Sequence, residues 1–228
     1  MKQIPLRLGR YLTQEERAEL RRQHPPDPVK WSHWPAELER MRQPAFRKWF
    51  ADVLAMSPTG FIRKAITPQM EAWARKLADR PANHSTFIKR LDRHGDNCLR
   101  GHLLEAVFKA VYPLALYVGD IETGHDFEVD EKKIDVKCRG INVDPRPHYW
   151  IHVPEVDIRR RCEGVIYVFG FVNMKRLDGF LVGWEKGEVF KESAEIHREG
   201  ERQAETNMIY NYARYVKRVS ELKPMRDL

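Results

Sequence analysis

The chain has 228 residues, of which 42% are hydrophobic and 32% charged, and its formal net charge is +7. This length suffices for one large or two small domains, and the hydrophobic fraction excludes wholesale disorder. No apolar run reaches membrane-spanning length, and the charged N-terminal segment lacks the apolar stretch of a secretion signal. Because the three cysteines form no CxxC pair, we expect a protein of the reducing cytoplasm without a disulfide framework.

Helix-forming segments dominate the first third of the chain. The capping-box pattern Thr13-Gln-Glu-Glu16 predicts a helix that ends before a run of prolines. Residues 35–54 and 67–77 predict two further helices, each with a proline at or near its start. The sequence therefore predicts a helical region over residues 1–82, followed by a second unit over residues 83–228.

Positive charge is concentrated in the N-terminal part of the chain. Residues 1–95 contain 19 Lys or Arg and 10 Asp or Glu, whereas residues 96–228 contain 21 and 23. A basic region beside an acidic one suits a polyanionic substrate, because the basic part can neutralise phosphates. The residues predicted to contact a nucleic-acid backbone are Arg42, Arg47, Lys48, Arg63, Lys64, Arg75 and Lys76.

The segment from Cys98 to Tyr112 predicts an amphipathic helix. Its apolar residues recur at the helical spacing, at positions 103, 104, 107, 108 and 111. Glu105 lies at the edge of this apolar stripe. If the helix packs on a sheet, it can direct Glu105 toward an acidic face of that sheet. The alternative is that Glu105 is an ordinary surface carboxylate.

Two alternating segments after this helix predict a β-hairpin. Residues 125–129 and 134–138 alternate polar and apolar side chains, and a polar loop over residues 130–133 joins them. In the second segment, Asp135 and Lys137 point to one face while their apolar neighbours point into a core. A carboxylate can hold a hard metal ion, and an ammonium beside it can position or polarise a water molecule.

The four-residue loop implies a pairing for the two strands. It places Glu128 opposite Asp135 and Asp126 opposite Lys137, so that three acids and a lysine share one face. Carboxylates crowded in this way repel one another unless a cation lies among them. The alternative is a solvent-facing hairpin whose lysines balance its acids.

The C-terminal half predicts the rest of a sheet. Strand-like runs cover residues 149–153, 164–171 and 179–184, and residues 186–196 predict a helix. The run over 164–171 is apolar on both alternations, as in a strand covered on both faces. Residues 207–219 are ambiguous, and residues 215–219 within them are compatible with a late strand. A mixed sheet with helices on its faces follows from this pattern.

In chain order, the helical Glu105 is followed by a strand with Asp126 and then by a strand with Asp135-x-Lys137. This arrangement resembles the PD-(D/E)xK nuclease superfamily over roughly residues 95–190, with short motifs and with histidine at 125 where the family has proline. The resemblance implies an α/β fold with a restriction-endonuclease-like mixed sheet flanked by helices. It also implies a site for Mg²⁺, with Mn²⁺ as a substitute, whose ligands are Glu105, Asp126, Asp135 and the carbonyl group of Val136.

By the same resemblance, Lys137 assists the attacking water, and the catalytic residues are Glu105, Asp126, Asp135 and Lys137. We therefore expect a Mg²⁺-dependent deoxyribonuclease, an endonuclease, that hydrolyses phosphodiester bonds of DNA. Two alternatives stay open: a nuclease-like fold that only binds nucleic acid, and a resolvase that acts on branched DNA as a homodimer.

The sequence also contains a possible zinc-binding set. His94, Cys98 and His102 are spaced by four, so they can share a helix face and ligate zinc. The sequence offers no obvious fourth ligand. It also contains no GxxxxGK[ST] loop and no dinucleotide fingerprint, which argues against an ATP-driven or redox enzyme.

Overall fold

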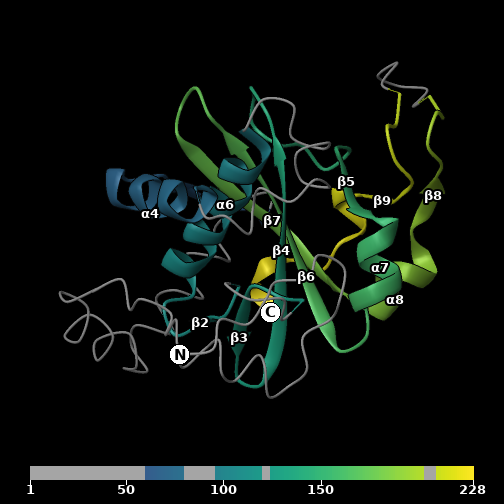
Figure 1. Ribbon diagram of the computed structural model, residues 1–228, viewed down its shortest axis with the longest axis horizontal. Helices are drawn as coiled ribbons and strands as arrows, with labels where there is room; N and C mark the ends of the chain where they lie inside the picture. Colours follow the sequence, from purple (N-terminus) through teal and green to yellow (C-terminus); the bar gives the residue numbers. More distant parts are fainter. Residues whose placement is uncertain (1–59, 80–95, 120–123, 203–208) are drawn as a thin grey trace, which may run out of the picture.

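The computed structural model describes residues 60–79, 96–119, 124–202 and 209–228. Its helices and strands, labelled in Figure 1, are β1 (Ile62–Ala65), α4 (Pro68–Ala78), α6 (Asp96–Val111), β2 (Leu116–Tyr117), β3 (Phe127–Val129), β4 (Lys132–Gly140), β5 (Trp150–Pro154), α7 (Glu155–Arg161), β6 (Val165–Asn173), β7 (Asp178–Lys186), α8 (Gly187–Ser193), β8 (Glu195–His197) and β9 (Arg214–Arg218). Two short 3₁₀ turns follow, at Val219–Glu221 and Met225–Asp227. None of the helices in these ranges is long and apolar enough to cross a membrane.

The centre of the molecule is a six-stranded mixed sheet with the order β1-β7-β6-β4-β3-β2. Strands β4 and β6 pair in parallel, and the other neighbours pair in antiparallel fashion. Helices α4 and α6 lie on one side of this sheet, and the smaller sheet β5-β9-β8 lies with α7 and α8 on the other (Figure 1). The predicted mixed α/β architecture, with helices flanking a mixed sheet, is confirmed.

Two apolar cores cover the two faces of the central sheet. Helix α6 faces Ile134 and Val136 of β4, and all five apolar positions predicted for this helix are buried. The opposite core contains Tyr167 and Phe169 of β6 together with Phe190 of α8. Because both faces are covered, every residue of β6 is buried, as the apolar run predicted.

Helix α4 begins and packs as its sequence predicts. The Thr67 hydroxyl accepts a hydrogen bond from the backbone N–H of Met70 at 3.3 Å, and Pro68 occupies the first turn. Helix α4 packs against α6, and its buried residues Trp73 and Leu77 belong to the same core as that helix. The helices predicted from Thr13 and over residues 35–54 lie outside the described residues.

Strand β1 lies within the region predicted to be helical, and its sequence does not predict a strand. Three of its four residues are exposed, so no alternation of polar and apolar residues marks it. The strand forms through pairing with the outer edge of β7, where Ile62 lies opposite Leu181. Residues 60–79 of the predicted N-terminal region therefore pack on the same sheet as the residues that follow.

Most of the later elements match their predicted segments. Strands β5, β6 and β7 cover the three predicted runs with boundaries shifted by one or two residues. The late strand predicted over residues 215–219 is β9, shifted by one residue to Arg214–Arg218. The helix predicted over residues 186–196 ends at Ser193, because the chain becomes extended at Ala194 and forms β8.

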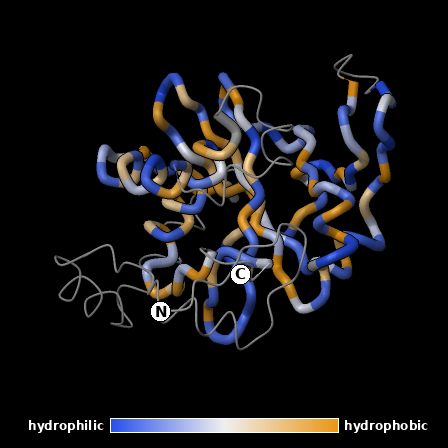
Figure 2. Tube along the Cα trace, in the orientation of Figure 1, coloured by the Kyte–Doolittle hydropathy of each residue, from blue (hydrophilic) through white to orange (hydrophobic). Residues whose placement is uncertain are grey.

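The predicted register of the β3–β4 hairpin is wrong by two residues. Asp130 and Glu131 form a two-residue turn with left-handed backbone, at φ 46° and 67°, as in a type I′ turn. Glu128 consequently lies opposite Lys133 rather than Asp135. The tip of the hairpin is strongly hydrophilic, which Figure 2 shows in blue. The Asp-Glu pair lacks the asparagine and glycine that usually mark such turns, so the sequence favours a longer loop.

The shift of two residues keeps every side chain on its predicted face, because side chains alternate with a period of two. Asp126, Glu128, Asp135 and Lys137 therefore share one side of the hairpin, as predicted. The cross-strand partners differ from the predicted ones, however. Asp126 now lies level with Asp135, since its N–H donates to the carbonyl of Ile134 at 2.8 Å.

Candidate functional site

Strand β4 carries the polar residues of the site on the side away from α6. Ile134 and Val136 point into the core beneath α6, so Asp135 and Lys137 point to the opposite side. Tyr167 lies beside Asp135 on the parallel strand β6. The alternation of β4 thus brings a carboxylate and an ammonium group to the boundary of the second core.

Lys137 is held between two carboxylates. Its Nζ lies 2.9 Å from Oδ2 of Asp135 and 2.9 Å from Oδ2 of Asp157, which belongs to the first turn of α7. The lysine side chain is 18% exposed, and its Nζ also lies 5.6 Å from the centre of the Tyr167 ring. Burial by itself would lower the pKa of Lys137, but Asp135 and Asp157 raise it above its ordinary value. The ammonium group therefore stays charged near neutral pH.

Asp126, the residue immediately before β3 and not within a strand as predicted, is the second carboxylate of the site. Its Oδ2 accepts a hydrogen bond from the backbone N–H of Val136 at 2.7 Å, which holds it beside β4. Burial raises the pKa of Asp126 well above its ordinary value, and the charges of Glu105 and Asp135 raise it further. The Val136 N–H and Lys137 oppose this shift without cancelling it. Asp126 thus lies in a region with an excess of negative charge.

Glu105 reaches this region from helix α6. Its side chain is buried, and its Oε2 lies 3.0 Å from Nδ1 of His102, one turn earlier. Burial alone would lower the pKa of His102, but Glu105 and a hydrogen bond with Cys98 raise it to about 10. His102 is therefore protonated and pairs with Glu105. The alternative of a surface glutamate is excluded by this burial.

Of the residues predicted for the site, Asp135 and Lys137 lie on β4, Asp126 lies beside them just before β3, and Glu105 lies within electrostatic range of Asp126. Glu128 is displaced by the register shift, and its Oε1 lies 3.2 Å from Nε2 of His125. Val136 lies between the two polar residues of β4, with its side chain in the core.

Two residues of the site are not identified by the sequence. Asp157 is 20 residues from Lys137, and only the packing of α7 brings its carboxylate to the ammonium group. The local sequence explains only why an acid occurs at this position. Asp157 lies in the first turn of the helix that follows Pro154, where acidic residues are favoured. Tyr167 is fully buried, and its hydroxyl has no hydrogen-bond partner among the described residues.

The predicted nucleic-acid contacts are only partly within the described residues. Arg42, Arg47 and Lys48 lie outside them. Lys64 on β1 and Lys76 on α4 are exposed, and Arg75 forms an ion pair with Glu71 at 2.6 Å. These exposed groups are compatible with backbone contacts, but they lie on elements other than those that carry the acidic site.

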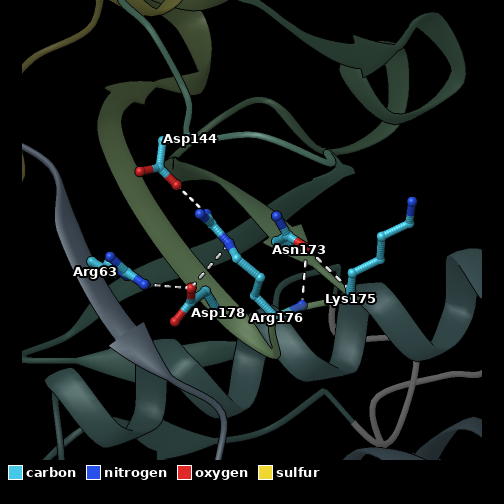
Figure 3. Close-up of polar contacts among 6 residues, drawn as sticks. All are labelled: Arg63, Asp144, Asn173, Lys175, Arg176 and Asp178. Carbon is cyan, nitrogen blue, oxygen red and sulfur yellow. Dashed lines mark hydrogen bonds and ion pairs between the residues drawn. The ribbon is translucent and has the colours of Figure 1, made fainter.

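Arg63 belongs to a separate polar network at the turn between β6 and β7. Its Nη2 lies 2.7 Å from Oδ2 of Asp178, and this carboxylate raises the pKa of the arginine. Figure 3 shows Arg176 meeting the same carboxylate and also Asp144. The Asn173 side chain closes the turn by accepting hydrogen bonds from the backbone N–H groups of residues 175 and 176, both at 3.1 Å.

Comparison of the chain with models of known protein families finds no match, and no curated protein is significantly similar to it.

The donor groups of the site suit a hard divalent cation. Carboxylate oxygens are the ligands that Mg²⁺ and Mn²⁺ prefer. The pKa of Asp126 is raised first by burial and then by the negative charges of Glu105 and Asp135, and a cation would offset those charges. In the described residues, no three His, Cys, Asp or Glu side chains already stand in a metal-binding arrangement. Of the alternative zinc set, Cys98 and His102 are hydrogen-bonded to each other, and His94 lies outside the described residues.

Proposed function

We propose that this protein is a Mg²⁺-dependent nuclease that hydrolyses phosphodiester bonds of DNA, an endonuclease with a restriction-endonuclease-like core. One observation carries the proposal: the ammonium group of Lys137 is fixed 2.9 Å from Asp135, on a strand whose neighbour brings Asp126 alongside. A charged donor beside a pair of carboxylates, one of them with a strongly raised pKa, suits a site that binds a cation and a phosphate together.

Each side chain has a role that follows from its geometry. Asp126 and Asp135 would hold the ion together with Glu105, and the carbonyl of Val136 is a further oxygen in the same stretch of β4. When bound, Mg²⁺ supplies charge that polarises the scissile phosphate and stabilises the departing oxygen. Asp126 uses Oδ2 for the Val136 N–H, which leaves its Oδ1 for the cation.

Lys137 would act as a charged donor rather than as a base. Because its pKa is raised by two carboxylates, it carries all its protons at neutral pH and cannot take one from water. Its N–H groups would instead orient the attacking water and stabilise the negative charge that develops on the phosphate oxygens. Asp157 would position Lys137 by holding its Nζ from the side of α7.

The proposal is tested by incubating supercoiled plasmid with the protein in Mg²⁺ or in EDTA. We expect nicking or linearisation in Mg²⁺ only. Lys137→Ala and Asp135→Asn should lower the rate by about a hundredfold or more, as expected for loss of a charge-stabilising group. Asp157→Asn should lower it less, because Asp135 still holds the lysine.

Lys133→Ala is the matched control, since Lys133 lies on the same strand and the same face but is exposed. Its activity should equal that of the wild type. Circular dichroism checks that each variant is folded. Cleavage that survives Lys137→Ala, or the absence of cleavage in both Mg²⁺ and Mn²⁺, would contradict the proposal. The second result, combined with DNA binding, favours the alternative of a nuclease-like fold that only binds nucleic acid.

A further inference from the structure

Two arginines near Lys137 lie largely out of solvent and have no carboxylate partner. Arg139 is two residues beyond Lys137 on β4, points to the same side, and donates a hydrogen bond from Nη1 to the carbonyl of Trp150. Arg214 on β9 is 5% exposed. Within the residues that the structure describes, neither guanidinium forms an ion pair.

The guanidinium of Arg214 is held rigidly by its neighbours. Its Cζ lies 4.6 Å from the centre of the Tyr210 ring and 4.0 Å from that of Tyr212. Nη2 donates to Oδ1 of Asn211 at 3.0 Å, whereas Nε is buried without a hydrogen-bond partner in the described part of the chain. A guanidinium that contacts two aromatic rings keeps its orientation at little entropic cost. The Nε–H group of Arg214 is therefore a pre-oriented donor that a ligand could use.

The positive charge of this arginine cluster, Arg139 with Arg214, is not balanced locally. After burial, the largest effect on the pKa of Arg139 is the charge of Arg214, which lowers it. Burial also lowers the pKa of the neighbouring His152 far below its ordinary value, and both arginines lower it further. The buried Lys217, by contrast, has a carboxylate partner, since its Nζ lies 3.8 Å from Oε2 of Glu185. A buried cation beside a half-buried one, with no carboxylate partner, is unfavourable unless an anion joins them.

A phosphate group is the anion that fits this position. The forked donors of arginine match phosphate oxygens, and Arg139 lies roughly 7 Å along the strand from Lys137, which is the rise of two residues. Arg139, His152 and Tyr212 are half-buried rather than buried, so the cluster borders solvent through these three side chains.

We infer that Arg139 and Arg214 form a phosphate subsite that binds the phosphate neighbouring the scissile one on the same DNA strand. The inference rests on the proposed function for the identity of its ligand. Both an internal phosphodiester and a terminal phosphate offer the required oxygens, and the experiment separates them.

The test measures the affinity of the full chain for fluorescent DNA duplexes in EDTA, where no cleavage occurs. One duplex carries 5′-phosphates and the other 5′-hydroxyls. We expect both Arg139→Gln and Arg214→Lys to weaken binding by about tenfold, but only Arg139→Gln, which removes a charge, to reduce the salt dependence by about one phosphate contact. Arg214→Lys keeps the positive charge but loses the fork of donors. Weakening with both duplexes assigns the subsite to an internal phosphodiester, and weakening with the 5′-phosphorylated duplex alone assigns it to a terminal phosphate.

Arg159→Gln is the matched control, because Arg159 is exposed on α7 and already pairs with Glu155 at 2.8 Å. It should bind within about twofold of the wild type. A second measurement guards against misfolding: inorganic phosphate should raise the melting temperature of the wild type and of the control, but not of the two cluster variants. Unchanged affinity in both cluster variants, or equal stabilisation of all proteins by phosphate, overturns the subsite.

The outcomes also separate this inference from the proposed function. A protein that never cuts DNA but binds it through Arg139 and Arg214 contradicts the nuclease and supports the subsite. A protein that cuts DNA in Mg²⁺, and whose affinity is the same in both cluster variants, supports the nuclease and contradicts the subsite.

Discussion

At the scale of single residues, two cationic side chains on the same face of β4, Lys137 and Arg139, have electrostatic surroundings of opposite sign. Lys137 is compensated by two carboxylates, whereas Arg139, the next residue on that face, has none in the described part of the chain. The strand therefore changes from an acidic to a basic environment within two residues. Such a boundary suits a ligand that carries both a metal ion and several phosphates.

His152 gives this boundary a pH dependence. Its pKa is lowered in the folded protein by burial and then by Arg214, Arg139 and Lys137. Below about pH 6.5, the ordinary pKa of histidine, the unfolded chain therefore binds a proton that the folded chain does not. The free energy of unfolding should consequently fall as the pH decreases below this value, by at most about 1.4 kcal/mol per pH unit from this residue.

Urea unfolding at pH 7.5 and at pH 5.5 measures this effect. The loss of stability between the two values should be smaller in His152→Gln than in the wild type by about 1 kcal/mol. His148→Gln, at an exposed histidine, serves as the control and should behave like the wild type. An identical loss in wild type and His152→Gln would show that His152 is not held neutral.

At the scale of elements, the site depends on how closely α6 approaches the sheet. A β-bulge interrupts the pairing of β6 with β7 between Phe169 and Gly170. A Cβ atom at position 170 would lie 2.3 Å from the carbonyl oxygen of Phe180 and 2.8 Å from Leu104 of α6. Glycine is therefore required here, and it allows α6 to carry Glu105 close to the strands of the site.

We expect Gly170→Ala to destabilise the protein by about 1–3 kcal/mol, because the added methyl group overpacks the interface. Gly101→Ala is the matched control on α6, where a Cβ atom has no neighbour within 4 Å. It should stabilise the helix by about 0.5–1 kcal/mol, since alanine is the better helix former. Thermal and urea denaturation of both variants measure the effect, and a neutral Gly170→Ala would contradict the packing described.

At the scale of the whole molecule, the two cores share one sheet. Strand β6 is buried by α6 on one side and by the smaller sheet with α7 on the other. The site lies along this shared sheet, with Glu105 from one layer and Asp157 from the opposite layer. Its geometry therefore depends on both layers being folded.

This arrangement predicts that the described part of the chain unfolds as one cooperative unit. Leu104→Ala in the first core and Phe190→Ala in the second should each lower the free energy of unfolding by about 2–5 kcal/mol. Hydrogen exchange should accelerate together in α6 and β9 in either variant. Exchange that accelerates in one layer only would show that the layers unfold independently.

Many elements of the fold follow from local patterns. The spacing of apolar residues predicts α6, and the uniformly apolar run predicts a strand buried on both faces. The strand period also places Asp135 and Lys137 on one face, which the structure confirms. These features are local because side-chain direction repeats every few residues in a helix or strand.

Other features depend on contacts between distant segments. The hairpin register follows from left-handed backbone at both Asp130 and Glu131, a conformation that aspartate tolerates but that is uncommon for glutamate. Strand β1 exists because the edge of β7 is available for pairing. Such features have no periodic pattern that a sequence could display.

The sequence by itself determined which residues of β4 face away from the core and that acids gather around its hairpin, because both depend on alternation along a strand. The tertiary structure decided which side chains meet there: Asp157 reaches Lys137 from α7, and Arg214 reaches the neighbourhood of Arg139 from β9. The physical reason is that an ion pair or a charge cluster between segments 20 or more residues apart depends on the packing of whole layers, and no local spacing encodes that packing.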